Sequence, residues 1–157
     1  MRAEPVQYIG WRRGEVSLAI TGPVTRPLPC ITLPHSPPAE LTAAVIDLGD
    51  GAPADFDARA EEIRGKIVLV TSANPPSVKR WVHRMEKYGR AVLAGATGFI
   101  FVNHYAGFGP ATGGIGPEAG GAGWIPAVSL SLEDGAYLRR LIKQQDEVRV
   151  HIHSTDV

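Results

Sequence analysis

The sequence predicts an α/β or α+β domain in which a small mixed sheet or open barrel is flanked by two helices. Short apolar segments typical of buried strands are interleaved with two segments of helical periodicity. Glycine and proline separate these segments, and further strand-like segments stand at both ends of the chain. With 157 residues, the chain has the usual length of one domain.

Residues 1–40 are expected to form an extended arm with one or two strands, packed on the rest of the domain. From Glu15 to Thr21 apolar residues alternate with polar or small ones, which is the pattern of a half-buried strand. The segment from Gly22 to Pro38 contains six prolines, too many for a helix or a regular ladder. We therefore expect extended surface chain here, with one short edge strand at Cys30 to Leu33.

The rest of the chain contains five further strand-like segments. A turn or short helix is expected between Phe56 and Ile63, where the apolar pattern is broken. The expected strands are Leu41 to Leu48, Ile67 to Val70, Phe99 to Asn103, Ala127 to Leu130 and Val148 to Ile152.

Two helices are predicted. Ser77 is a suitable N-cap for the first, which is expected to run to about Leu93. The second is expected to begin after Ser131, because Ser131 to Asp134 matches a capping box. The expected inner-face residues are Trp81, Met85, Tyr88 and Val92 in the first helix, and Leu138, Leu141 and Ile142 in the second.

Composition excludes several classes of function. The chain has 16 basic residues (lysine plus arginine) and 16 acidic residues (aspartate plus glutamate). With no net positive charge, it is not expected to attract nucleic acid or an anionic membrane. The single cysteine, Cys30, cannot form an internal disulfide or a thiolate metal cage. No apolar run has the length of a signal sequence core or a membrane span, so we expect no membrane insertion by this segment.

A glycine-rich segment from Gly107 to Gly123 is the most conspicuous candidate surface. It is longer than the roughly 12 to 15 residues usual for structureless connections, which indicates a functional or mobile loop. It leads to another strand rather than into a helix, which argues against a phosphate-binding loop. Tyr105, Phe108 and Trp124 around it either contact a peptide or partner, or anchor the loop by packing on the domain.

A run of basic residues recurs at helical spacing in the first predicted helix. An ordinary solvated face is the simpler interpretation, and an acidic docking surface on an attached domain is the functional alternative. Arg80, Arg84 and Lys87 are the candidate binding residues on this face. The full run is Lys79, Arg80, His83, Arg84, Lys87 and Arg90.

His151 and His153 are expected on one face of the last strand, where both imidazoles could approach an adventitious metal ion. Two ligands do not make a zinc site, and the sequence identifies no third, so a solvated strand face is favoured. We therefore predict no metal site and no catalytic residue in this chain. A small hydrolase that uses these histidines is the least favoured alternative.

Taken together, these segments resemble the protease-associated (PA) domain. The family's strand, helix-to-strand and final strand-to-helix patterns are matched from about Leu41 to Gly135, with mild departures at Ile63 and Thr97. Residues 41–153 are therefore identified as a PA-like domain, followed by a tail or linker at residues 154–157. The matching segments are Ile63 to Val70, Arg84 to Asn103, Ile125 to Gly135, and Val45 to Gly51 with Asp55 and Phe56.

The resemblance implies a non-catalytic module of the kind found in zinc-dependent aminopeptidases. It implies a lid, substrate-access or protein-interaction role, with zinc held by an attached catalytic domain and none in this chain. The implied partners are that catalytic domain and a peptide or protein substrate, and the implied location is extracellular or in the cell envelope. A stand-alone cargo-binding module of the sorting-receptor type is the alternative. The strand-like end of the chain leads us to expect a piece of a longer protein.

Overall fold

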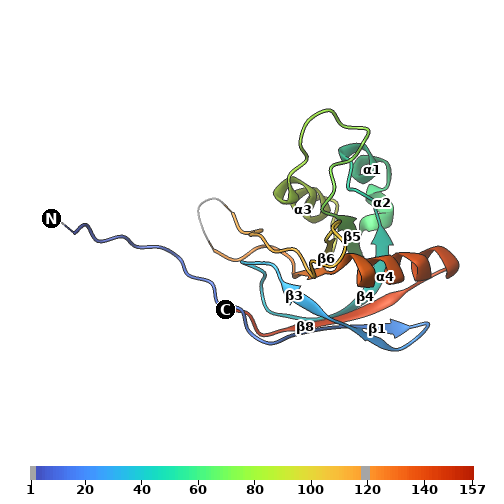
Figure 1. The fold of residues 1–157 in the computed structure, drawn as a ribbon, viewed down its shortest axis with the longest axis horizontal. Helices are drawn as coiled ribbons and strands as arrows, with labels where there is room; N and C mark the ends of the chain where they lie inside the picture. The colour runs from blue at the N-terminus through green and yellow to red at the C-terminus, as the bar shows by residue number, and fades with distance from the viewer. Residues whose placement is uncertain (1–2, 118–120) are drawn as a thin grey trace.

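The computed structural model describes residues 3–117 and 121–157 and has eight strands and four helices (Figure 1). The strands are β1 Val16–Gly22, β2 Arg26–Leu28, β3 Cys30–Thr32, β4 Ala39–Asp47, β5 Ile67–Thr71, β6 Gly98–Val102, β7 Ala127–Leu130 and β8 Arg149–Ser154. The helices are α1 Pro53–Ala58, α2 Ala60–Ile63, α3 Arg84–Leu93 and α4 Leu132–Gln144.

All eight strands form one mixed, open sheet in the order β2-β1-β8-β4-β5-β6-β7-β3. Strands β4, β5, β6 and β7 run parallel to one another, whereas the strands on either side of them pair antiparallel. The predicted mixed sheet is therefore confirmed. Strand β3 lies at one edge, as the prolines around Cys30 to Leu33 predict.

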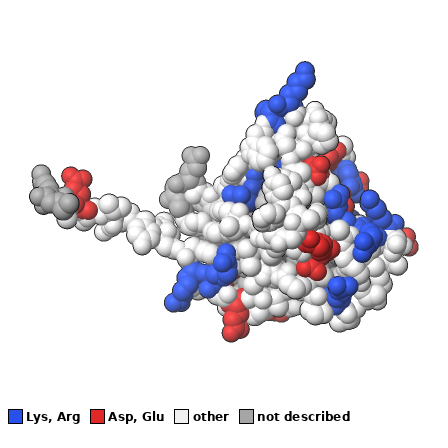
Figure 2. Space-filling model, viewed as in Figure 1, with Lys and Arg blue, Asp and Glu red and all other residues white. Residues whose placement is uncertain are grey.

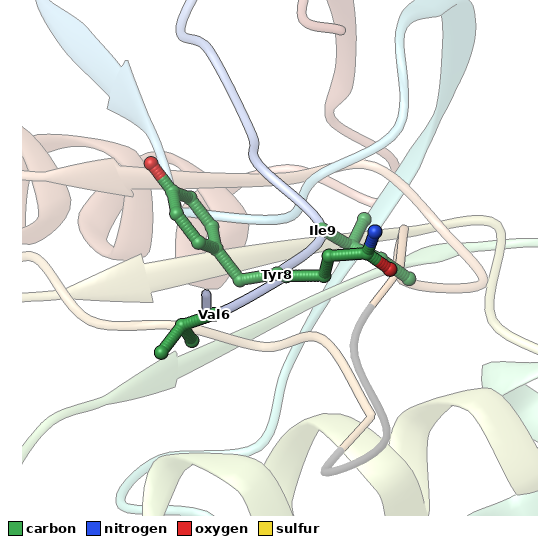
Figure 3. A pocket seen from close by; sticks show the side chains of 4 residues that line it. Val6, Tyr8 and Ile9 are labelled. Atoms are coloured by element: carbon green, nitrogen blue, oxygen red, sulfur yellow. The ribbon is translucent and has the colours of Figure 1, made fainter. Parts of the chain in front are cut away.

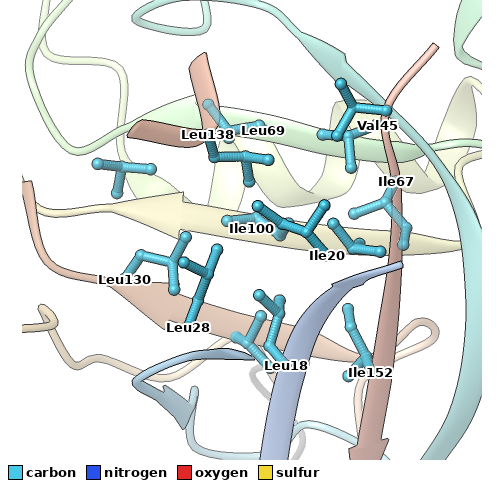
Figure 4. Packing of buried hydrophobic residues seen from close by; sticks show 14 of the residues in the cluster. Leu18, Ile20, Leu28, Val45, Ile67, Leu69, Ile100, Leu130, Leu138 and Ile152 are labelled. Carbon is cyan, nitrogen blue, oxygen red and sulfur yellow. The ribbon is translucent and has the colours of Figure 1, made fainter. Parts of the chain in front are cut away.

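The central strands are apolar on both faces because both faces are covered. Ile67 and Leu69 of β5 point into a core that also contains Leu18 and Ile152 of the outer strands and Leu138 of α4 (Figure 4). On the other face lies a second core. It contains Val68, Val70, Phe99 and Phe101 from β5 and β6, together with Phe56, Ile63, Tyr88 and Ala91 from α1, α2 and α3. Parallel strands between two helical layers have this continuous apolar sequence.

The second predicted helix is confirmed and the start of the first is wrong. In α4 the Ser131 hydroxyl accepts a hydrogen bond from the Asp134 amide, so the expected N-cap forms. Helix α3, however, begins at Arg84 and is capped by His83, whose Nδ1 accepts from the Met85 amide. Residues 77–83 are instead a non-helical loop.

The loop before α3 is held by the side chain of Asn74. Its Oδ1 accepts from the Val82 amide at 2.8 Å, and its Nδ2 donates to the Arg80 carbonyl at 3.1 Å. These bonds occupy backbone groups that a helix beginning at Ser77 would need. Trp81, which the helical pattern places on the inner face, is consequently 62% exposed.

The N-terminal residues combine a free segment with an integral part of the sheet. Residues 3–10 extend away from the body (Figures 1 and 2), whereas β1 lies between β2 and β8. The proline-rich segment is extended, as expected, but it also buries Leu28 and Leu33. The domain limits at residues 40 and 153 stay predictions.

The end of the chain is tied to the start of β1. The buried carboxylate of Asp156 accepts hydrogen bonds from the Gly14 amide and the Thr32 hydroxyl. Arg12 and Val157 exchange two backbone hydrogen bonds, of 2.6 and 3.1 Å. Both ends of the body therefore meet at one corner.

Charges of both signs are interspersed over the face of the body shown in Figure 2. This distribution agrees with the zero net charge of the sequence. None of the helices in the described ranges is both long and apolar enough to cross a membrane.

Candidate functional site

A hollow of about 450 Å³ opens beyond the carboxyl ends of β5 and β6. We call it the strand-end pocket. Ser72 follows β5, Asn103 and His104 follow β6, and α3 and the loop before it supply a further wall. The carboxyl ends of parallel strands are the usual ligand-binding edge of α/β sheets, so the position itself indicates a binding site.

Polar side chains fix the two loops that leave these strands. The Asn103 Nδ2 donates to the Gly109 carbonyl at 2.8 Å, and its Oδ1 accepts from the Tyr105 amide at 3.1 Å. The Ser72 hydroxyl lies 2.6 Å from the His104 Nδ1 and also accepts from the His104 amide at 2.9 Å. The backbone of both loops is therefore positioned before any ligand arrives. Ser72, Asn103 and His104 were not predicted from the sequence as site residues.

Arg84 is held with its guanidinium in one place. Its Nε donates to the Gly114 carbonyl at 3.1 Å, and its Cζ lies 5.9 Å from the centroid of the Phe101 ring. A Cβ at Gly113 would overlap the guanidinium in this position, and the φ of 142° at Gly113 also favours glycine. Burial lowers the pKa of Arg84, but an arginine stays charged at any physiological pH.

Lys87 lines the same pocket but is not on a solvated basic face, so that interpretation is wrong for this residue. Its side chain is 1% exposed, and its Nζ donates to the Thr71 carbonyl at 2.9 Å and the Ala73 carbonyl at 2.7 Å. The residue joins α3 to the end of β5. Burial lowers the pKa of Lys87 to about 8, against a smaller opposing effect of Asp50.

This lowered pKa predicts that stability depends on pH in alkaline solution. Well between pH 8 and 10.5, the lysine is mostly protonated in the unfolded chain but mostly neutral in the folded one. The unfolded state then binds more protons, so stability rises with pH, by roughly 1 kcal/mol from pH 8.5 to 9.5. Urea unfolding of wild type and Lys87→Met across this range measures the effect, which should be absent in the variant.

The comparison of two proteins is needed because Cys30 acts in the opposite direction. Burial raises the pKa of its thiol to about 11, so Cys30 lowers stability as pH rises through 9 to 11. This contribution is common to wild type and Lys87→Met and cancels in their difference. If the difference in free energy of unfolding between wild type and Lys87→Met does not change with pH, the lowered pKa of Lys87 is contradicted.

Arg80 lies beside the pocket and is already paired. Its Nη1 and Nη2 lie 2.7 and 2.8 Å from the two carboxylate oxygens of Glu86, in a bidentate ion pair. This pair, with a smaller effect of Arg90, lowers the pKa of Glu86 to about 2. The positive charge of Arg80 is thus locally balanced, unlike that of Arg84.

Two of the three aromatic candidates lie at the pocket. Tyr105 and Phe108 line it, with 60% and 80% of their surface exposed, and their ring centroids are 6.2 Å apart. Trp124 is 64% exposed and lies outside the pocket lining. This exposure favours contact with a partner over packing on the domain, although the binding role of all three stays a prediction.

The glycine-rich loop is anchored by residues other than these aromatics. Ile115 is fully buried, and its amide donates to the Pro34 carbonyl at 3.0 Å. The Gly123 amide donates to the His35 carbonyl at 2.7 Å. The Tyr88 hydroxyl donates to the Ile125 carbonyl at 2.8 Å and accepts from the Ile125 amide at 2.9 Å. Residues 118–120 of the expected loop lie outside the described residues.

His151 and His153 lie on β8 and share one carboxylate. Glu40 on β4 places its oxygens 3.0 Å from the His151 Nε2 and 2.6 Å from the His153 Nδ1. Within residues 3–117 and 121–157, no cluster of three or more histidine, cysteine or acidic side chains is arranged to hold a metal ion. The imidazoles are therefore partners of Glu40 rather than an evident zinc site.

A second hollow, of about 550 Å³, lies beside the N-terminal segment (Figure 3). Its described lining residues are Val6, Gln7, Tyr8 and Ile9, which are consecutive residues of one extended segment. A ligand site needs polar groups that converge from several elements, as in the strand-end pocket. We therefore take the strand-end pocket as the candidate site, although the second hollow is larger.

Comparison with known proteins agrees with this architecture. A family model described as "PA domain" matches residues 21–138, and no curated protein matches the sequence. An aminopeptidase from Aneurinibacillus sp. strain AM-1 is 22% identical, with a TM-score of 0.75 over 94% of this chain and 32% of its own. A zinc aminopeptidase from Bacillus subtilis, BSAP, is 25% identical, with a TM-score of 0.70 over 92% of this chain and 31% of its own.

A peptidase M28 precursor from Shewanella amazonensis SB2B is 23% identical, with a TM-score of 0.73 over 94% of this chain and 36% of its own. The chain therefore spans about a third of the length of these solved structures. The family model covers well over half of the chain, in the region where the sequence patterns and the strand-end pocket both lie. The chain belongs to the PA domain family.

Proposed function

We propose that this chain is a non-catalytic module of a zinc aminopeptidase and that it governs access of peptides to a catalytic domain. The main support is the extent of the structural match. Nearly the whole chain superposes on about a third of each of three peptidases, two of them named as aminopeptidases and one of these as a zinc enzyme. The remaining two thirds of such a protein would hold the zinc and the reacting groups.

The geometry of the folded body, without the extended N-terminal segment, fits this role (Figure 1). Arg12 and Val157 are hydrogen-bonded neighbours, so a catalytic domain joined to both would approach the module at one corner. Domains inserted into others usually have such adjacent ends. The extracellular or cell-envelope location that the family resemblance implies remains part of this proposal.

The first test is activity of the chain by itself. With added zinc, the chain should not hydrolyse leucine p-nitroanilide above the rate of zinc in buffer. Hydrolysis that purifies with the chain and is removed by a chelator would contradict the non-catalytic assignment. His151→Ala with His153→Ala tests the hydrolase alternative, and should change no measured rate.

The second test addresses access. In a parent peptidase, a short glycine-serine linker can replace residues 13–156, because Arg12 and Val157 already lie side by side. We expect hydrolysis of long peptides to rise relative to hydrolysis of leucine p-nitroanilide when the module is removed. An unchanged ratio in a folded, zinc-loaded protein would contradict the access role and favour a cargo-binding module.

A further inference from the structure

The strand-end pocket combines positive charge with exposed aromatic surface. Its charged lining residues are Arg84 and Lys87, and none of its described lining residues is an aspartate or glutamate. Both cations are held in place, since Arg84 and Lys87 donate to backbone carbonyls. In a chain with zero net charge, this is a local site for an anionic group.

We propose that the strand-end pocket binds the C-terminal carboxylate of a peptide that ends in an apolar residue. The carboxylate pairs with Arg84, and the last side chain packs against Trp81 and Phe108. The inference deepens the proposed function, because it names the part of a peptide that this module recognises.

Arg84 has the geometry that carboxylate binding requires. Its Nε is used by Gly114, whereas its Nη1 and Nη2 have no hydrogen-bond acceptor within the described ranges. The Gly114 carbonyl holds the Nε and the Phe101 ring centroid lies 5.9 Å from the Cζ, so part of the side-chain freedom is already lost before binding. A fixed guanidinium with free N–H groups matches the two oxygens of a carboxylate.

Lys87 contributes charge rather than direct contact. Its Nζ already donates to two carbonyl oxygens at 2.9 and 2.7 Å. A buried cation close to the ligand nevertheless favours an anion, since nearby charges are poorly screened away from water. Because only Arg84 contacts the carboxylate directly, its substitution should reduce peptide affinity more than substitution of Lys87.

Trp81, Tyr105 and Phe108 supply the apolar part of the site. They come from two different loops and border one hollow, while 62%, 60% and 80% of their surface is exposed. Exposed aromatic rings around a pocket are typical of binding surfaces. A terminal residue carries its carboxylate and its side chain on the same Cα, so both reach these groups within a pocket of about 450 Å³.

Three blocked peptides test the proposal by titration followed with calorimetry or backbone NMR. N-acetyl-Ala-Phe has a free terminal carboxylate, and N-acetyl-Ala-Phe-amide has none. N-acetyl-Asp-Phe-amide has only a side-chain carboxylate. We expect the free acid to bind about 10- to 100-fold more tightly than either amide, the cost of losing a charged hydrogen-bonded pair. Amide shifts should centre on residues 72, 84 and 103–105.

The proposal is overturned if the free acid and its amide bind equally, or if no peptide binds at millimolar concentration. Equal binding of the free acid and the Asp-containing amide would overturn the C-terminal assignment in favour of an acidic side chain. The acetyl group prevents aminopeptidase hydrolysis, so the result does not depend on turnover. Failure of the access test would therefore leave this binding measurement interpretable, and the reverse also holds.

Variants connect binding to individual residues. Arg84→Gln should lower the affinity for the free acid about 10- to 100-fold and remove the preference for the acid over the amide. Arg84→Lys should restore part of this preference. Arg140→Gln has the same charge change on exposed α4 surface and should stay within about twofold of wild type. Phe108→Ala removes an exposed ring and should weaken acid and amide alike, by about fivefold. Wild-type affinity in a folded Arg84→Gln protein would contradict the role of Arg84.

Discussion

Phe99→Ala is expected to lower the free energy of unfolding by about 3–5 kcal/mol, as large-to-small substitutions of buried aromatics do. Phe99 is fully buried on β6, its ring is edge-on to Tyr88 at 5.5 Å, and it is stacked with Phe101 at 6.2 Å. The substitution removes both contacts and leaves a cavity beneath α3. Urea unfolding monitored by circular dichroism measures the loss.

Phe108→Ala is the matched control for this prediction. It makes the same chemical change at a side chain that is 80% exposed, so stability should change by less than about 0.5 kcal/mol. A similar loss of stability in both variants would contradict the assignment of Phe99 to the core.

Phe99 also supports Tyr88 and Phe101. Partial unfolding of Phe99→Ala should therefore also abolish peptide binding at the pocket.

Tyr88→Phe is expected to cost about 2–3 kcal/mol although it removes a single oxygen atom. The Tyr88 hydroxyl both donates to and accepts from the backbone of Ile125, at 2.8 and 2.9 Å. Its loss leaves a donor and an acceptor unpaired in a partly buried place, and each such group costs about 1–3 kcal/mol. Burial raises the pKa of Tyr88, which keeps this hydroxyl protonated at neutral pH.

Hydrogen exchange gives the more specific result for Tyr88→Phe. The Ile125 amide should exchange faster by a larger factor than the amides of β5, because the bond that is lost pins the end of the glycine-rich loop. Tyr105→Phe serves as the control. Tyr105 is 60% exposed, so loss of its hydroxyl should affect neither stability nor exchange. Uniform acceleration across the sheet in Tyr88→Phe would indicate global destabilisation without a local role.

The central strands could be predicted because their sequence signal is local. Ile67 to Val70 and Phe99 to Val102 are continuous apolar runs bounded by turn residues, and such runs fit only positions covered on both faces. The second long helix could be predicted for the same reason, since the cap at Ser131 lies within three residues of its partner.

The start of the first long helix could not be predicted in this way. The sequence after Ser77 has helical spacing, yet Asn74 binds the backbone of Val82 and Arg80 and holds residues 77–83 in a loop. A side chain that competes for backbone groups several residues away leaves no periodic signal. The one local indication of a loop here is the Asn74-Pro75-Pro76 sequence directly before Ser77.

The structure brings only some of the predicted binding residues together, and their binding role stays a prediction. Arg84, Lys87, Tyr105 and Phe108 all line the strand-end pocket, as a shared site would require, whereas Trp124 lies elsewhere. Arg80 lies outside the pocket lining and is paired with Glu86. Charge and aromatic character can be read from a sequence, but the pairing of a charge depends on what folds beside it.

The sequence by itself determined the mixed α/β fold, the family and the absence of net charge, because these follow from local periodicity, residue pattern and composition. Only the tertiary structure decided which cations line the pocket. Helix α3 places Arg84 beneath the glycine-rich loop and buries Lys87 against the end of β5, so one guanidinium remains available for binding and one ammonium is committed to backbone carbonyls. The physical reason is that burial and hydrogen-bond partners are set by residues distant in the chain, here 14 to 30 positions away.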